Sequence, residues 1–188
     1  VSKARSVNEI QQAVDAGQMQ FGENYLQESL DKIDSLEGKN LIWHFIGPIQ
    51  SNKTASIAEK FDWVHSIERF KIAKRLSDQR HPKLGQLNVL LQVNIDREKT
   101  KSGFFLEDID EIVPEIKKLP NISLRGFMCI PNPDNSADSF TKMAELLSKY
   151  PDLDTLSMGM SADLELAIEK GATFIRVGAD IFGEREYN

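Results

Sequence analysis

Short runs of β-forming residues alternate along this chain with segments in which apolar residues recur every three to four positions. The β-type runs cover residues 19–23, 41–46, 61–67, 87–95, 122–130, 154–157 and 173–177. A helical pattern separates each run from the next, as where Phe70, Ala73 and Leu76 share one face. Strict alternation of strands and helices predicts a parallel sheet covered by helices.

The first residues indicate how this sheet closes. Ser6 and Glu9 form a capping box in front of a helix, so Val1, Ser2 and Lys3 stand where the end of a further strand would belong. Seven strands in an open doubly wound sheet are one possibility. We instead predict a single domain over residues 1–188, a (β/α)8 TIM barrel whose first strand is present only as a stub. Such barrels usually need about 200–250 residues, so the length of this chain fits a truncated one.

Composition and charge argue against several classes of function. Lys and Arg total 23 against 29 Asp and Glu, a net charge of −6. This balance argues against a nucleic-acid or anionic-membrane binder, because those partners require a basic face. No apolar run approaches the ~18–20 residues that span a bilayer. The single Cys129 cannot form a disulfide within the chain, as expected in the reducing cytoplasm. Three histidines without clustered carboxylates or thiols predict no metal site.

The ends of the predicted strands carry the candidate chemistry, because a barrel of this kind places its active site at the C-terminal ends of its strands. Lys3 can form a Schiff base with a carbonyl if its amine is partly desolvated. The simpler alternative is a solvated lysine. Arg176 follows two β-forming residues, so we expect its guanidinium to reach the barrel mouth, with a strand-end ion pair as the alternative.

The last two loops of such a barrel usually bind phosphate, where backbone N–H groups and a helix N-terminus meet the anion. Ser157, Gly159 and Ser161 open a helix without a bulky side chain, and Gly178 lets the backbone approach a ligand closely. Ser161 also offers a hydroxyl, although small residues at a helix start more often act as caps.

Several longer motifs together resemble one protein family. They are VSK (1–3), FGENY (21–25), WHFIGPIQSNK (43–53), KSG (101–103), LSMGMS (156–161) and RVGADIFG (176–183). The chain resembles the pyridoxal phosphate homeostasis protein family over its whole length. Members of that family are single-domain relatives of the alanine racemase N-terminal barrel. The resemblance implies that the first helix and most of the first strand of the barrel are missing from this sequence.

The resemblance also implies a cofactor and its ligands. Lys3 would carry pyridoxal 5′-phosphate (PLP) as an internal aldimine, and Arg176 would face the pyridine nitrogen. Ser161, together with the backbone of Gly178 and Ala179, would hold the phosphate. Asn24 and Ser157 would be neighbours of the cofactor, and Lys101 is a candidate for a secondary PLP contact involved in transfer.

By the same resemblance, the expected function is to hold PLP and to buffer or deliver it to apo-enzymes, without significant turnover. An arginine opposite the ring nitrogen disfavours its protonation, so the ring becomes a poorer electron sink. Racemases of this architecture use a second base, a tyrosine from another domain, which this chain lacks. We expect a monomer in the cytoplasm, since nothing replaces the racemase dimerisation domain.

Two enzymatic alternatives stay open at this point. A PLP-dependent amino-acid racemase is the first. The second is a Schiff-base aldolase or phosphosugar enzyme that uses the same lysine and phosphate loops. An aldolase would need a carboxylate base beside Lys3, and Glu23 is the obvious candidate.

Overall fold

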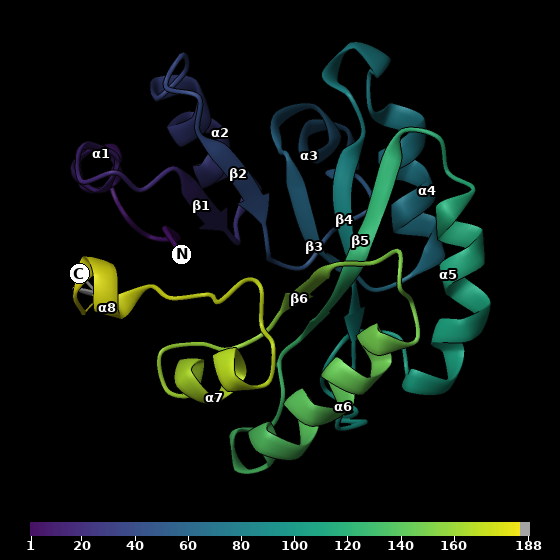
Figure 1. The fold of residues 1–188 in the computed structure, drawn as a ribbon. Helices are drawn as coiled ribbons and strands as arrows, with labels where there is room; N and C mark the ends of the chain where they lie inside the picture. Colours follow the sequence, from purple (N-terminus) through teal and green to yellow (C-terminus); the bar gives the residue numbers. More distant parts are fainter. Residues whose placement is uncertain (185–188) are drawn as a thin grey trace.

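The computed structural model describes residues 1–184, which form one curled parallel sheet with helices around it (Figure 1). Neighbouring strands in the sheet follow the chain order without a reversal: β1 (Gln20–Glu23), β2 (Ile42–Phe45), β3 (Trp63–Ile67), β4 (Leu87–Val93), β5 (Ile122–Cys129) and β6 (Thr155–Ser157). A doubly wound sheet reverses its strand order at a switch point. Sequential order with outer helices is instead the arrangement of a (β/α)8 barrel, so the predicted fold class is confirmed.

The helices lie on the outside of this partial barrel. They are α1 (Val7–Asp15), α2 (Leu26–Ser35), α3 (Thr54–Lys60), α4 (Phe70–Gln79), α5 (Ile109–Lys117), α6 (Ser136–Ser148), α7 (Leu164–Glu169) and α8 (Ala179–Phe182). The capping box predicted for the first helix is present, with Ser6 and Glu9 each accepting a backbone N–H of the other. None of the helices among residues 1–184 is long and apolar enough to cross a membrane.

The prediction of a seventh strand over residues 173–177 is wrong, because this segment forms no regular strand. Only one isolated bridge joins it to the sheet, between Phe174 and Ser157. Its backbone still runs beside β6, because the Met158 N–H donates to Phe174 O at 3.1 Å and the Arg176 N–H to Gly159 O at 2.9 Å. The ladder is short because β6 has three residues and Gly159 turns away with a φ of 92°.

The N-terminal stub lies where the prediction put it, between β1 and the segment 173–178. On one side the Ser2 N–H donates to Gly22 O of β1 at 2.9 Å. On the other side the Val1 ammonium donates to Val177 O. Gly178 comes so near that a Cβ there would lie 3.3 Å from Val1 O. Residues 1–3 therefore join the two ends of the curled sheet.

A continuous apolar core fixes the strands against the helices. In β4 both faces are covered, and Leu87, Val89 and Leu90 are fully buried, as expected of a parallel strand between two layers. From the helix side, α4 contributes Ile72 and Leu76, which are also fully buried. Each such side chain contributes about 1.5–3 kcal/mol by leaving water. The strand ends that carry the polar residues are thus held on a rigid frame.

Candidate functional site

Lys3 is the last residue of the stub, which lies next to the end of β1. Its side chain is half-buried, and its ammonium makes no hydrogen bond or ion pair with the residues that the structure describes. The neighbouring Glu23 is fully buried and binds Ser2 Oγ at 2.6 Å and Lys32 Nζ at 2.8 Å. Both bonds end on Glu23 Oε1, so this carboxylate is the buried ion-pair partner of Lys32.

Arg176 and Ser157, both predicted site residues, are in contact. Arg176 Nη1 donates to Ser157 Oγ at 3.0 Å, and Nη2 donates to the carbonyl oxygen of Cys129 at 2.8 Å. Ser157 is fully buried at the end of β6, and Arg176 is half-buried. These two bonds hold the guanidinium against the ends of β5 and β6.

Behind Ser157 a line of hydrogen bonds crosses the barrel interior. His65 Nδ1 lies 2.8 Å from Ser157 Oγ, and His65 Nε2 lies 2.9 Å from His44 Nδ1. His44 Nε2 then lies 3.1 Å from Gln20 Oε1 at the start of β1. We call these five residues, Arg176, Ser157, His65, His44 and Gln20, the histidine chain.

The donor and acceptor capacities of these side chains fix which atom donates each hydrogen bond in the histidine chain. The Gln20 oxygen can only accept, so His44 carries its proton on Nε2 and accepts at Nδ1. His65 must then donate from Nε2 and accept at Nδ1, which requires Ser157 to donate its hydroxyl proton. The Ser157 oxygen in turn accepts from Arg176. Both imidazoles are therefore neutral Nε2–H tautomers, and Ser157 retains only acceptor capacity toward a ligand.

Aromatic rings pack against the two imidazoles, which are both buried. The His44 ring stacks on Trp63 at a centroid distance of 5.7 Å, and the Phe174 ring meets its edge at 5.1 Å. Burial lowers the pKa of His44 to about 4. Burial, more than the neighbouring Arg176 charge, lowers the pKa of His65 well below its usual value. Neither ring is protonated at neutral pH, so neither supplies a general acid.

Two cavities open beside these residues. One, of about 690 Å³, lies between β1 and the segment 173–177 and is lined by Gly22, His44 and Arg176, among others. The other, of about 310 Å³, lies at the strand ends and is lined by Asn24, Asn94 and Lys101, among others. Within residues 1–184, the buried Asn24 Oδ1 has no hydrogen-bond partner. An unpaired buried acceptor at a cavity wall is available to a ligand.

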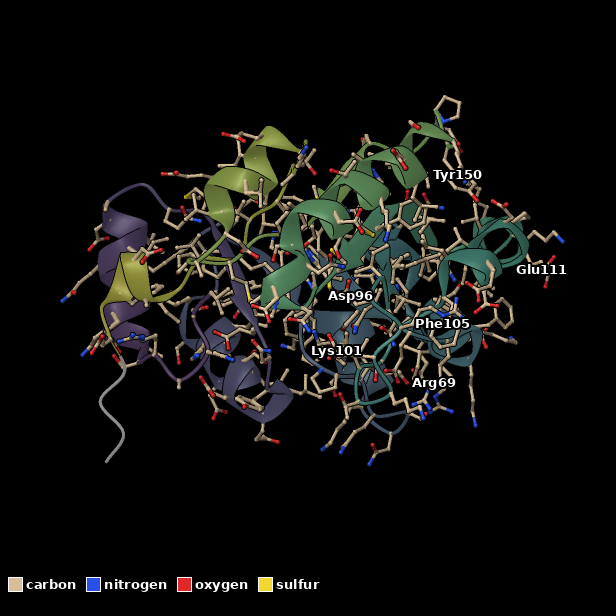
Figure 2. All side chains as sticks on the ribbon, turned by 90° about the horizontal axis from the view of Figure 1, so that it is seen from below. Arg69, Asp96, Lys101, Phe105, Glu111 and Tyr150 are labelled. Atoms are coloured by element: carbon tan, nitrogen blue, oxygen red, sulfur yellow. The ribbon has the colours of Figure 1, made fainter. Side chains whose placement is uncertain are left out.

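Lys101 stands at the second cavity. Its ammonium donates to Glu98 Oε1 at 2.7 Å and to the carbonyl oxygen of Ile130 at 3.2 Å. In Figure 2, Lys101 and Asp96 lie near the middle of the molecule, whereas Arg69 and Glu111 lie nearer its edge. Lys101 therefore lies at the same cavity as Asn24 but is already paired.

The predicted phosphate ligands do not all line one cavity. Ser161 is exposed in the turn before α7 and lines a separate cavity of about 520 Å³ with Ser136 and Asp163. It does not cap α7, because Asp163 is the N-cap residue and its carboxylate accepts the Met160 N–H at 2.7 Å. Gly178 is the N-cap of α8, and Ala179 begins that short helix with its side chain exposed.

One feature of the site cannot be predicted from the sequence. Interior positions predict His44 and His65 as core or mouth residues, but not the bonds that connect them. Cys129 is buried at the end of β5, and burial raises the pKa of its thiol to about 12. In the described part of the chain, no three His, Cys, Asp or Glu residues gather where they could hold a metal ion.

The chain is similar to known proteins of one family. The family model "Alanine racemase, N-terminal domain" matches residues 2–186. A pyridoxal phosphate homeostasis protein of Pseudomonas aeruginosa is 52% identical over 192 residues, covering 100% of this chain and 84% of that protein. The protein of the same name from Escherichia coli (strain K12) is 48% identical over 199 residues, with 100% and 85% covered.

Solved structures agree with these relatives. PipY from Synechococcus elongatus, solved without PLP, superposes with a TM-score of 0.89 at 35% identity over 97% of this chain and 90% of that one. PipY with PLP bound gives a TM-score of 0.86 at 34% identity over the same shares. An alanine racemase of Clostridium difficile, 14% identical with a TM-score of 0.75, covers 97% of this chain and 49% of the racemase, and shares the fold alone.

Proposed function

Since the chain belongs to the pyridoxal phosphate homeostasis proteins, within the alanine racemase N-terminal domain family, we propose that it binds PLP at Lys3 and buffers or delivers it inside the cell. The observation that carries this proposal is the half-buried Lys3 amine, which has no partner among the described residues, in a chain 34% identical to PipY, a protein solved with PLP bound.

PLP offers a protein three groups to bind: an aldehyde, a phosphate and a ring nitrogen. PLP supplies an aldehyde, which condenses with a primary amine to an imine and releases water. Lys3 would provide that amine. Ser161, with the backbone N–H groups of Gly178 and Ala179, would hold the phosphate, and Arg176 would face the ring nitrogen. The orphaned Asn24 Oδ1 is a buried acceptor without a protein partner, which is what an absent ligand would leave.

The residues of the site favour holding PLP over catalysing a reaction on an amino acid. Arg176 carries a permanent charge, and its two terminal nitrogens are already bound to Ser157 and to Cys129 O. A ring nitrogen facing it stays unprotonated, so the ring withdraws electrons weakly. The histidine chain offers no second base, because both imidazoles use both nitrogens within it. The close relatives are likewise named as homeostasis proteins and not as racemases.

We also propose that the protein works as a monomer in the cytoplasm and passes PLP to apo-enzymes. A single buried thiol is typical of a reducing compartment. Light scattering across a concentration series tests the monomer, and a concentration-independent dimer would contradict it. Delivery is tested by the reactivation of an apo-enzyme, which should proceed faster from the loaded protein than from the same concentration of PLP after dilution.

A titration with PLP tests the binding site. We expect a visible absorption band that borohydride removes, with the reduced adduct mapping to the peptide that contains Lys3. Lys3→Ala should abolish the band, whereas Lys53→Ala, an exposed lysine in the loop after β2, should keep it. A racemisation assay on the loaded protein separates the carrier from the racemase, and a normal enzymatic turnover would favour the racemase.

A further inference from the structure

Two side chains of α2 hold the backbone on both sides of Lys3. Lys32 Nζ donates to Ser2 O at 2.7 Å, and that carbonyl belongs to the peptide group before Lys3. Glu28 Oε1 accepts the Ala4 N–H at 2.6 Å, and that N–H belongs to the peptide group after Lys3. Lys32 and Glu28 also form an ion pair with each other, four residues apart on the helix. One ion pair therefore fixes both peptide groups that define the direction of the Lys3 side chain.

Lys32 has no capacity left for another role. Its side chain is 4% exposed, although it is a lysine on an outer helix. An ammonium has three N–H donors, and the three acceptors here are Ser2 O, Glu23 Oε1 and the Glu28 carboxylate. Glu23 is fully buried, and within residues 1–184 its Oε2 has no partner. The Lys32 ammonium is thus enclosed behind the stub, so it is not an alternative amine for a ligand.

The arrangement is a poor source of stability. Buried ion pairs lose as much by leaving water as they gain by attraction, and apolar side chains of similar volume often stabilise a protein more. Ala4 has a φ of 57°, a left-handed conformation that is costly for a residue with a side chain. Glu28 holds Ala4 in that conformation by accepting its N–H. These contacts cost stability, and what they provide is one defined backbone conformation for residues 2–4.

We propose that Lys32 and Glu28 are positioning residues for Lys3, which aim its amine at the barrel mouth by fixing the peptide groups on either side of it. The inference rests on the proposed function, because it takes Lys3 as the residue that attaches PLP. Neither positioning residue touches the ligand. Their removal should therefore weaken the covalent attachment without weakening the non-covalent contacts to the ring and phosphate.

Two ligands separate these effects. PLP forms an imine with Lys3, whereas pyridoxamine 5′-phosphate has the same ring and phosphate but an amine in place of the aldehyde and cannot. Lys32→Met retains the aliphatic stem and removes the three donated bonds. We expect it to raise the Kd for PLP about tenfold, equivalent to about 1.4 kcal/mol, with the Kd for pyridoxamine 5′-phosphate unchanged.

The control and a second pair of variants complete the experiment. Lys142→Met breaks the exposed Asp138–Lys142 pair, which has the same spacing on α6, and should change neither Kd. Glu28→Ala removes the acceptor of the Ala4 N–H and should behave like Lys32→Met. Glu28→Gln keeps an acceptor oxygen and should restore most of the affinity for PLP. This pair also tests the proposal if Lys32→Met does not fold.

Three outcomes would overturn the proposal. PLP affinity that is unchanged in Lys32→Met and Glu28→Ala would show that Lys3 needs no such support. Equal weakening of both ligands would indicate a general structural role. A wild-type protein without a reducible adduct at Lys3 would refute the proposed function itself, and this inference with it.

Discussion

Replacing His44 with phenylalanine is expected to remove a pH-dependent part of the free energy of unfolding. The wild-type imidazole is 5% exposed and stays neutral in the folded protein, because burial lowers its pKa from 6.5 to about 4. In the unfolded chain the same group binds a proton below pH 6.5. His44→Phe retains a ring against Trp63 and Phe174 but cannot be protonated.

The sign and the size follow from this difference in pKa. Between pH 6.5 and 4 the unfolded chain binds a proton that the native protein does not, so stability rises with pH in that window. The stabilisation is complete above the unfolded pKa of 6.5 and is lost as the pH falls toward 4. At 1.36 kcal/mol per pKa unit, His44 alone accounts for a loss of about 2 kcal/mol at pH 5 and about 3 kcal/mol at pH 4.

Urea unfolding at pH 7, 6 and 5 measures the effect. The wild-type free energy of unfolding should fall by about 2 kcal/mol more than that of His44→Phe between pH 7 and 5. Carboxylates contribute equally to both proteins and cancel in the comparison. His81→Gln is the control, because that imidazole is exposed in a loop, and it should follow the wild type. Parallel pH dependences for wild type and His44→Phe would contradict a buried His44 that stays neutral in the folded protein.

Two further predictions concern the neighbours of the histidine chain. Ser157→Ala leaves His65 Nδ1 and one Arg176 donor unpaired, so urea unfolding should show a loss of about 1–3 kcal/mol for a buried unsatisfied group; a loss near zero would mean that water replaces the hydroxyl. Cys129 should not react with a thiol reagent at pH 8 in the folded protein, because it is fully buried and its thiol has a pKa of about 12, and it should react at once in urea. Rapid labelling of the native protein would contradict the described burial.

The sequence predicted the barrel well because its strands are strongly apolar and its helices are well marked. The β4 segment is buried almost throughout, and the capping box at Ser6 locates the first helix. The segment 173–177 has the same β-forming composition, but its state depends on its partner. Since β6 ends after three residues and Gly159 turns the chain, this segment makes separate backbone hydrogen bonds and one bridge but no regular ladder.

The polar contacts of the site depend on register and burial, which one sequence does not specify. In the sheet His44 pairs with Trp63 rather than with His65, so only the folded barrel brings the two imidazoles together. Glu28 and Lys32 have the spacing of an ordinary surface pair on a helix. The stub packs over them and buries Lys32, which no periodicity of α2 indicates.

The proposed function depends above all on Lys3 as the attachment point for PLP. Mass mapping of the borohydride-reduced complex tests it most directly. We predict one modified peptide, beginning at the stub and carrying the reduced adduct on Lys3, and no such peptide in Lys3→Ala. An adduct on Lys101 or on several exposed lysines, with Lys3 unmodified, would contradict the account.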